Sequence, residues 1–461
     1  MNGMRRLISI LLMLCLLAPC AAFAQEEQPA GKHDSWPEIF KVEYKTSDRK
    51  EDNNRYYVYK EYLITTNETV NEEIRSIVDD YDAQLFPQMQ PDGDKNAKRN
   101  SRLDIEVIHY FTGDSWVSTL TEARISYKRQ QVSCDFTTRT YDLESGERIL
   151  LTDIFPEDSP AWDLLAQRVQ EHLSSLFPED PRNPEAIEQL CSREALENVD
   201  FTLSGMELTL HYQAKTVYPD RPVMMHVRFF YDELWDYMTP EARIQTDNTD
   251  YKMVAITCDD GPSYGPTNNT LVNYRHYGAR VTYFTVGTRV NGNPDILMRQ
   301  FDQNHIIASH SYDHWSGYTL DNPGMRAQLN KHNELLISLV GEPVTMFRAP
   351  GGTYPPWVEA EIGVPIIQWS VDSYDYTGKS AKRIFYSIRN NTIDGDIILL
   401  HDSGKIMYKA IPIYADWLRK NGFMMVTVEE LARINGIIMQ PNVVYHKLFE
   451  GDWSKRNDSN I

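Results

Sequence analysis

The stretch Met253-Val254-Ala255-Ile256-Thr257-Cys258-Asp259-Asp260-Gly261-Pro262 decides the fold of the second half of the chain. A short apolar, β-branched run here ends in two adjacent carboxylates, a pattern typical of a buried strand that leads into a polar loop. Neighbouring carboxylates repel each other, so a folded protein keeps both ionised only beside a positive group, such as a metal ion or an arginine. The pair Asp259 and Asp260 therefore predicts a bound cation.

A second polar motif follows about fifty residues further along the chain, at His310-Ser311-Tyr312-Asp313-His314. Its two imidazoles are four positions apart, so they can converge on one metal ion if the segment is helical or tightly turned. Together the two motifs predict a catalytic metal site.

Short apolar runs alternate with helical patterns in this half of the chain. Seven runs are expected to be strands: 254–257, 281–285, 306–308, 346–348, 366–369, 397–400 and 423–426. Helical periods separate most of them, for example at Met325 to Leu339 and Ile411 to Lys420, which favours parallel strands joined by crossover helices. We therefore expect an α/β fold, a distorted (β/α) barrel of about seven strands.

Polar residues follow five of these expected strands. They are Asp259 and Asp260, His310 and His314, Arg348 to Gly352, Asp372 and Asp375, and His401 and Asp402. A single histidine or aspartate at such a place is more often a structural or capping residue than a ligand. Because the loops after barrel strands build one shared site, five coincidences favour a functional centre over separate caps.

The chain begins with a segment typical of export. Arg5 and Arg6 precede an apolar run from Leu7, and Ala22-Phe23-Ala24 suits a cleavage site. We expect residues 1–24 to be a signal peptide and the protein to be secreted or associated with the cell envelope. An uncleaved anchor is the alternative, because the run is long enough to cross a thin bilayer.

Charge and cysteine content exclude several classes of protein. The 461-residue chain has a formal charge of −20, and no basic footprint for nucleic acid stands out. Removal of the signal would leave Cys134, Cys191 and Cys258, which allow at most one disulfide and form no metal-binding pattern. No protein partner is predicted.

The first half of the chain mixes strand and helix periods without regular alternation. We predict a polar linker at 25–35, an α+β accessory domain at 36–238, a linker at 239–250, a second domain at 251–440 and a C-terminal tail at 441–461. Within the accessory domain, Val70 to Leu85 shows one apolar helical face, and Leu103, Ile105 and Val107 alternate like a half-buried strand. Ser159-Pro160 is typical of a helix start, and Pro91 to Ser101 of a mobile loop.

The second domain resembles the NodB-type polysaccharide deacetylases, grouped as carbohydrate esterase family four, over residues 251–438. Thr257 to Pro262 resembles the first motif of that family, and His310 to His314 matches its histidine-serine/threonine-x-x-histidine motif. Three further motifs resemble the rest in order: Arg348-Ala349-Pro350, Asp372 to Tyr376, and Leu399-Leu400-His401. The resemblance implies a NodB-like barrel and a hydrolase that acts on linear amides.

The resemblance also implies a role for each motif residue. Asp260, His310 and His314 would hold one divalent metal ion, with Zn the best match, although Co, Ni or Fe suit the same ligands. Asp259 would be the general base, taking a proton from the attacking water, and Arg348 would pair with it and keep it ionised.

On the other side of the substrate, His401 would protonate the departing amine. Asp375 would orient His401, with Asp372 as the alternative orienting carboxylate. Leu399 would line the pocket for the acetyl methyl group, and a backbone N–H near Pro350 and Gly351 would complete the oxyanion site.

Three positions depart from the family pattern. Cys258 stands where an aromatic residue is common, and we interpret it as a small apolar filler. Gly351 replaces the usual tyrosine and Tyr376 the usual tryptophan, so two substrate-binding positions differ from the family. None of the three departures removes a metal ligand or a proposed catalytic group.

The first half of the chain resembles, more faintly, the α+β domain that precedes the catalytic domain in some bacterial peptidoglycan deacetylases. Its pattern at 140–155, followed by a helix and a hairpin at 201–212, carries that likeness. Tyr56, Tyr57, Tyr59 and Tyr62 could stack on sugar rings, but packing in the core and sheet is favoured.

These observations lead to one hypothesis and its alternatives. We expect metal-dependent removal of N-acetyl groups from a cell-wall polymer, with peptidoglycan N-acetylglucosamine or N-acetylmuramic acid favoured by the predicted export and the two-domain layout. Chitin oligomers, another exopolysaccharide and acetylated xylan are alternative substrates. A non-catalytic glycan-binding protein on a retained barrel is the alternative from another class.

Overall fold

The computed structural model describes residues 41–51, 54–89, 101–127, 130–315, 322–355, 362–378, 380–404 and 406–448. The predicted signal peptide at 1–24, the linker at 25–35 and positions 449–461 of the predicted tail lie outside these ranges, as does the predicted loop up to residue 100. Among the described residues, no helix combines the length and the apolar character of a membrane span.

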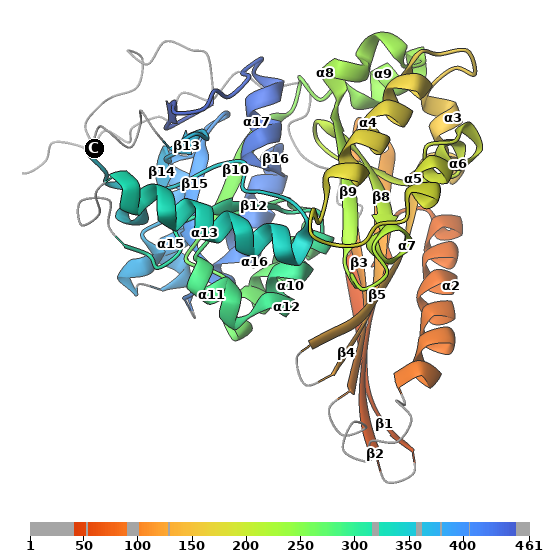
Figure 1. The fold of residues 1–461 in the computed structure, drawn as a ribbon, viewed down its shortest axis with the longest axis horizontal. Coiled ribbons are helices and arrows are strands. Elements are labelled where there is room, and N and C mark those ends of the chain that lie inside the picture. The colour runs from red at the N-terminus through yellow and green to blue at the C-terminus, as the bar shows by residue number, and fades with distance from the viewer. Residues whose placement is uncertain are drawn as a thin grey trace, which may run out of the picture.

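A six-stranded sheet forms the first half of the molecule, in the order β1-β2-β3-β4-β5-β6 (Figure 1). Only β2 and β3 pair in parallel; the other neighbours are antiparallel. Helix α2 (Glu68–Leu85) packs Val70, Ile74 and Val78 against one face of this sheet. The strands are β1 (Lys41–Glu51), β2 (Asn54–Ile64), β3 (Ser101–Thr112), β4 (Trp116–Tyr127), β5 (Gln130–Asp142) and β6 (Arg148–Ile149).

A smaller antiparallel sheet, β7-β8-β9, follows with several short helices around it. Helix α4 begins directly after Pro160, which confirms the predicted start. The elements are α3 (Leu151–Ile154), α4 (Ala161–Ser175), α5 (Pro184–Leu190), α6 (Arg193–Glu197), β7 (Asp200–Leu203), β8 (Glu207–Gln213), α7 (Ala214–Val217), β9 (Met224–Phe230) and α8 (Tyr231–Leu234).

The stretch 239–250 is folded, so its prediction as a linker is wrong. It contains helix α9 (Pro240–Thr246), capped by the Thr239 hydroxyl. Gln245 accepts hydrogen bonds from two backbone N–H groups of the β3–β4 turn, and Asn248 donates to the carbonyl of Gly205 at 2.7 Å. Gln245 and Asn248 therefore satisfy buried backbone groups instead of facing water.

The second half of the chain has the expected α/β architecture of parallel strands and helices, although strand pairing among the described residues does not close the barrel. The order is β12-β11-β10-β15-β14, with β16 also paired to β10 and β13 paired to β17. The expected strand at 346–348 is reduced to Phe347, which bridges Ser309 on one side and Ile366 on the other. The strands are β10 (Lys252–Asp259), β11 (Thr282–Thr285), β12 (Ile306–Ser309), β13 (Ile366–Ile367), β14 (Val371–Asp372), β15 (Ile397–His401), β16 (Phe423–Val426) and β17 (Val444–Tyr445).

Helices surround these strands (Figure 1). They are α10 (Tyr264–His276), α11 (Gly287–Gly292), α12 (Pro294–Asp302), α13 (Asn322–Val340), α15 (Ala381–Asn391), α16 (Met407–Lys420) and α17 (Val428–Ile434). Because β17 pairs with β13 and Leu448 is fully buried, the part of the predicted tail that the structure describes belongs to the barrel. The predicted end of the second domain at residue 440 is therefore too early.

One hydrophobic cluster extends through both halves of the molecule. Alternate residues of β10 face opposite sides, as strand geometry requires: Val254 and Ile256 pack inside one cluster, while Met253 and Ala255 belong to a second cluster. That second cluster continues into the first half of the chain through Leu210 and its neighbours.

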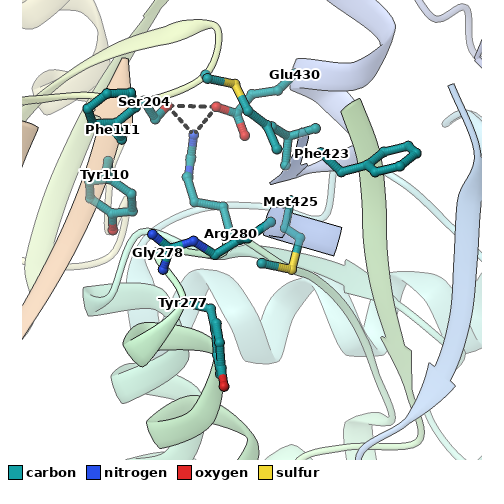
Figure 2. A pocket seen from close by; sticks show the side chains of 13 residues that line it. Tyr110, Phe111, Ser204, Tyr277, Gly278, Arg280, Phe423, Met425 and Glu430 are labelled. Carbon is teal, nitrogen blue, oxygen red and sulfur yellow. Dashed lines mark hydrogen bonds and ion pairs between the residues drawn. The ribbon is translucent and has the colours of Figure 1, made fainter. Parts of the chain in front are cut away.

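Buried charges complete the junction between the halves. Arg275 on α10 donates to both carboxylate oxygens of Glu61 at 2.7 Å and to Glu106 at 3.0 Å. Strand β3, expected to be half-buried, is consequently buried on both faces. Figure 2 shows a second junction, where Arg280 reaches Ser204 and Glu430 beside a cavity of about 20 Å³.

Candidate metal centre and active site

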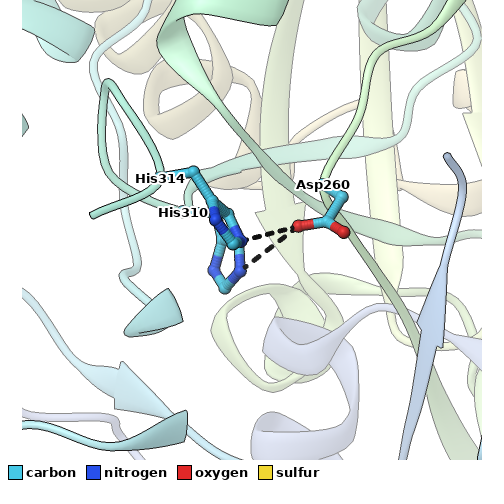
Figure 3. A group of neighbouring side chains, drawn as sticks. All are labelled: Asp260, His310 and His314. Atoms are coloured by element: carbon cyan, nitrogen blue, oxygen red, sulfur yellow. Dashed lines mark ion pairs between the residues drawn. The ribbon is translucent and has the colours of Figure 1, made fainter. Parts of the chain in front are cut away.

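Three side chains from the first two motifs converge at the carboxyl ends of the barrel strands (Figure 3). Asp260 follows β10, and His310 and His314 follow β12. The Asp260 Oδ1 atom lies 2.9 Å from Nε2 of His314 and 3.7 Å from Nε2 of His310. The histidines meet through a tight turn and not a helix, with Ser311 and His314 both at positive φ. Left-handed residues of this kind concentrate at functional sites.

The atoms of this trio suit a metal ion. His310 donates from Nδ1 to the carbonyl of Arg348 at 2.8 Å, which leaves the lone pair of Nε2 facing Asp260. Burial lowers the pKa of His310 and so favours its neutral, ligating form. The Asp260 Oδ1 atom is buried. Burial opposes the ionisation of this carboxyl, but the close contact with His314 and the nearby His310 lower its pKa. Two nitrogens and one oxygen match a catalytic metal site with open positions.

Asp259 points to a different partner. Its Oδ1 accepts a hydrogen bond from Nη1 of Arg348 at 2.7 Å. Arg348 is fixed by further donation to the Thr257 hydroxyl at 2.8 Å and by Phe284, whose ring centroid lies 4.1 Å from the guanidinium carbon. Sequence reasoning did not single out Thr257, although its position two residues before Asp259 places both on one face of β10. The adjacent aspartates therefore differ in their nearest partners, although Asp259 Oδ2 also lies 3.8 Å from Nε2 of His310.

His401 ends β15 and pairs with Asp375. Its Nδ1 lies 2.7 Å from Asp375 Oδ1, and its backbone N–H donates to the other carboxylate oxygen at 2.8 Å. Burial alone would lower the pKa of His401, but Asp375, with Asp259 and Asp260 nearby, raises it to about 9. The alternative residue, Asp372, instead accepts hydrogen bonds from the Tyr376 hydroxyl and the Tyr374 backbone. The structure thus puts Asp375, not Asp372, against His401.

The expected substrate-binding residues lie around this pair. Leu399 is buried two residues before His401, on the same face of β15. The Tyr376 ring is 58% exposed, and its centroid lies 5.4 Å from that of His401. Gly351 lies in the 3₁₀ turn Pro350–Gly352 at φ 69°, a conformation that favours glycine over the tyrosine usual in the family.

Asp402 is a buried acid next to the site for which the sequence suggested no individual role. Its Oδ2 accepts from the Thr267 hydroxyl at 2.9 Å. Burial, reinforced by Asp260, raises the pKa of Asp402 to about 7. A Cβ atom at Gly261 would lie 2.3 Å from Asp402 Oδ2, which explains the glycine in the first motif. In the sequence, Asp402 could have been recognised by its position directly after His401, the last residue of the fifth motif.

Cys258 is fully buried in an apolar cluster of the barrel, and its Sγ lies 3.6 Å from the Tyr274 hydroxyl. Burial raises the pKa of this thiol well above its usual value. The side chain fills space as interpreted from the sequence, and its neutral form makes it a poor nucleophile.

Comparison with known proteins agrees with this geometry. Residues 246–362 match the polysaccharide deacetylase family. The peptidoglycan-N-acetylglucosamine deacetylase of Bacillus cereus is 30% identical over 190 residues, which cover 40% of this chain and 89% of that enzyme. The chain belongs to the polysaccharide deacetylase family. This membership confirms the resemblance that the motifs carry.

A longer relative is matched over a smaller part of its own length. The peptidoglycan-N-acetylglucosamine deacetylase PgdA of Listeria monocytogenes is 32% identical over 180 residues, and the match covers 39% of each chain. Among solved structures, the peptidoglycan deacetylase PdaC of Bacillus subtilis is 26% identical, with a TM-score of 0.40, over 41% of this chain and 93% of that one. The chain therefore spans well under half the length of the Listeria enzyme.

Proposed function

We propose that this protein removes N-acetyl groups from peptidoglycan in a metal-dependent reaction. The observation that carries the proposal is the trio of Asp260, His310 and His314, flanked by the Asp259–Arg348 pair and the His401–Asp375 pair. Relatives named as peptidoglycan deacetylases support the choice of polymer.

Asp260, His310 and His314 are proposed to hold the metal ion, with zinc favoured by the two imidazoles and one carboxylate, and cobalt, nickel or iron compatible with them. When bound, a divalent ion polarises the acetamide carbonyl and makes a water molecule easier to deprotonate.

The remaining residues move protons. Asp259 accepts the proton of the attacking water, and Arg348 holds that carboxylate in one orientation. His401 is protonated below pH about 9 and donates its proton to the amine nitrogen as the carbon–nitrogen bond breaks. The products are acetate and a free amino sugar. Leu399, on the same strand face as His401, is proposed to contact the acetyl methyl group.

Export is proposed as well, because peptidoglycan lies outside the membrane and residues 1–24 are typical of a signal peptide. An uncleaved N-terminal anchor would serve the same location. Fractionation of expressing cells, with the N-terminus of the mature chain determined, distinguishes cleavage, anchoring and retention in the cytosol.

Acetate release tests the proposed activity. The protein is incubated with peptidoglycan, chitin oligomers and acetylated xylan, each with and without a chelator. We expect release that is greatest from peptidoglycan, that stops with chelator and that returns when metal is added. Release that is insensitive to chelator would contradict metal dependence. Absence of release from every polymer by metal-loaded protein would favour the alternative of a non-catalytic glycan-binding protein.

A further inference from the structure

A groove of about 500 Å³ lies between the sheet of the first half and helices α10 and α12. It is far larger than the 20 Å³ cavity beside Arg280 at the same junction. Tyr44, Tyr57 and Tyr59 from β1 and β2 line one side, and Tyr264 with Asn268 from α10 line the other. Neither the metal centre nor the proposed chemistry uses this groove.

Aromatic faces remain accessible in the groove. Tyr44 on β1 is 63% exposed and Tyr264 on α10 is 44% exposed. Two tyrosines of β2, Tyr56 and Tyr62, are instead buried in the core. The Tyr44 and Tyr59 rings are stacked, with centroids 6.1 Å apart and planes inclined by 26°. A tyrosine ring offers an apolar face together with a polar hydroxyl, which suits the apolar face and hydroxyl rim of a sugar ring.

The charges of the groove are balanced. Three guanidinium groups, of Arg102, Arg124 and Arg299, line it together with three carboxylates, of Asp104, Glu106 and Asp295. Arg102 donates to Asp104 at 2.6 Å, and Arg299 pairs with Glu106, so these groups are held in place by one another. A balanced polar lining gives no footprint for nucleic acid or another polyanion. It suits a neutral ligand that is rich in hydroxyl and amide groups.

Both helices that line the groove begin near the metal centre. Tyr264 follows Asp260 by four residues, so their Cα atoms are at most about 14 Å apart. The Asn293 side chain, which precedes α12, donates to the carbonyl of Pro262 at 3.4 Å. The end of the groove at Tyr264 therefore lies close to the loop that carries Asp260, the proposed metal ligand.

We propose that this groove binds a stretch of the same glycan strand whose N-acetyl group enters the metal centre. The inference rests on the proposed function, because it takes the substrate to be a polymer of N-acetylated sugars. It assigns the first half of the chain a share in substrate binding, with the Tyr44 and Tyr264 rings as stacking surfaces.

The test uses strand length. Peptidoglycan strands freed of stem peptides are separated into tetrasaccharides and long strands, and binding and acetate release are measured for both. Gly265→Trp fills the groove, since a Cβ at Gly265 meets no atom within 4 Å; Tyr44→Ala removes one ring. Gly265→Ala and Tyr386→Ala, an exposed tyrosine on α15, serve as matched controls.

We expect Gly265→Trp and Tyr44→Ala to weaken binding and kcat/KM for long strands by roughly threefold to tenfold, the effect of one aromatic contact. Tetrasaccharides and both control variants should behave like the unaltered protein. Equal losses for short and long strands, or no loss for either, would overturn the proposal. A loss seen only with strands that carry stem peptides would overturn it too, in favour of a peptide ligand.

The two proposals fail in different ways. If the unaltered protein releases no acetate, the proposed function is wrong, while the binding comparison between long strands and tetrasaccharides still decides the role of the groove. If acetate is released but the groove variants bind long strands normally, only the groove proposal is wrong.

Discussion

Buried carboxylates gather in two regions of this molecule and find positive charge in different ways. At the junction of the two halves, Arg275 bonds to Glu61 and Glu106 at 2.7 and 3.0 Å. At the mouth of the barrel, Arg348 reaches only Asp259, and the buried Asp260 Oδ1 faces imidazole nitrogens. At the junction, the cation is an arginine of the chain itself, and its bonds link the two halves. At the mouth of the barrel, the cation beside Asp260 is proposed to be a metal ion from solution.

A third group shows that close ligand atoms alone do not make a metal site. Glu122, Cys134 and Asp302 also bring their ligand atoms within 4.8 Å of one another. Arg124, however, contacts Glu122 and lies 3.6 Å from Asp302, so a guanidinium already provides the positive charge. What distinguishes the barrel mouth is the lack of such an arginine beside Asp260 among the described residues.

The largest effect is expected from His310→Ala. Removal of one of three ligands should weaken metal binding by more than the roughly 10- to 100-fold loss typical of outer-shell changes, and activity should fall with it. Titration with zinc measures the affinity. The control is His172→Ala, which removes a histidine of α4 paired with Glu342. Similar zinc affinity in both variants would contradict the assignment of the ligands.

The junction should respond in stability and not in metal binding. Arg275→Ala removes the guanidinium partner of the buried Glu61 and leaves Glu106 with Arg299 alone. Breaking a buried pair in this way typically costs about 3–5 kcal/mol of unfolding free energy. Arg75→Ala breaks an exposed pair with Glu68, which water and salt screen, and should cost far less. Urea unfolding measures the loss of unfolding free energy in each variant. Equal costs would show that the junction does not depend on its buried pairs.

Metal ion should stabilise the barrel by mass action. At a free concentration of 100 times Kd, it adds about 2.7 kcal/mol to the unfolding free energy. We expect this increment in the unaltered protein and in Arg275→Ala, and none in His310→Ala. Thermal unfolding with and without zinc measures it. A missing increment in Arg275→Ala alone would mean that the two regions are coupled.

A smaller effect is expected in the pH profile of kcat/KM. The pKa of His401 is raised to about 9, so the histidine is protonated below that pH and loses its proton above it. Asp375→Asn should lower this pKa and move the alkaline limb of the profile to lower pH. Each unit of change in the pKa corresponds to about 1.4 kcal/mol of lost interaction with the protonated histidine. Asp372→Asn should move it less, because Asp372 bonds to Tyr376. Equal shifts of the alkaline limb in both variants would contradict the pairing of His401 with Asp375.

The barrel mouth could be anticipated from the sequence, whereas the junction could not. The proposed metal ligands and proton carriers lie in short motifs at strand ends, so spacing and residue type indicate them directly. Glu106 lies in a strand whose alternation predicted one solvent-facing side, and only the packing of α10 against that side buries it. Gln245 and Asn248 appeared to be linker residues for the same reason, since polarity does not reveal which backbone groups a side chain will satisfy.

Short elements were also hard to predict. Single bridges at Phe347 replace an expected strand, and the two-residue strand β17 lies in an expected tail. Such pieces hold few residues, so their periodicity is too weak to read, and their position depends on neighbours distant in the sequence. The choice of Asp375 over Asp372 likewise needed the distance to His401.

Asp260 is proposed to bind the metal, while Asp259 stays off it as the base. Zinc titration and turnover of the two isosteric variants Asp259→Asn and Asp260→Asn separate these two roles. We predict that Asp259→Asn binds zinc with nearly unchanged affinity and loses roughly 10²- to 10⁴-fold in turnover, and that Asp260→Asn loses zinc affinity. Near-normal turnover in Asp259→Asn, or equal loss of zinc in both variants, would contradict this division of roles.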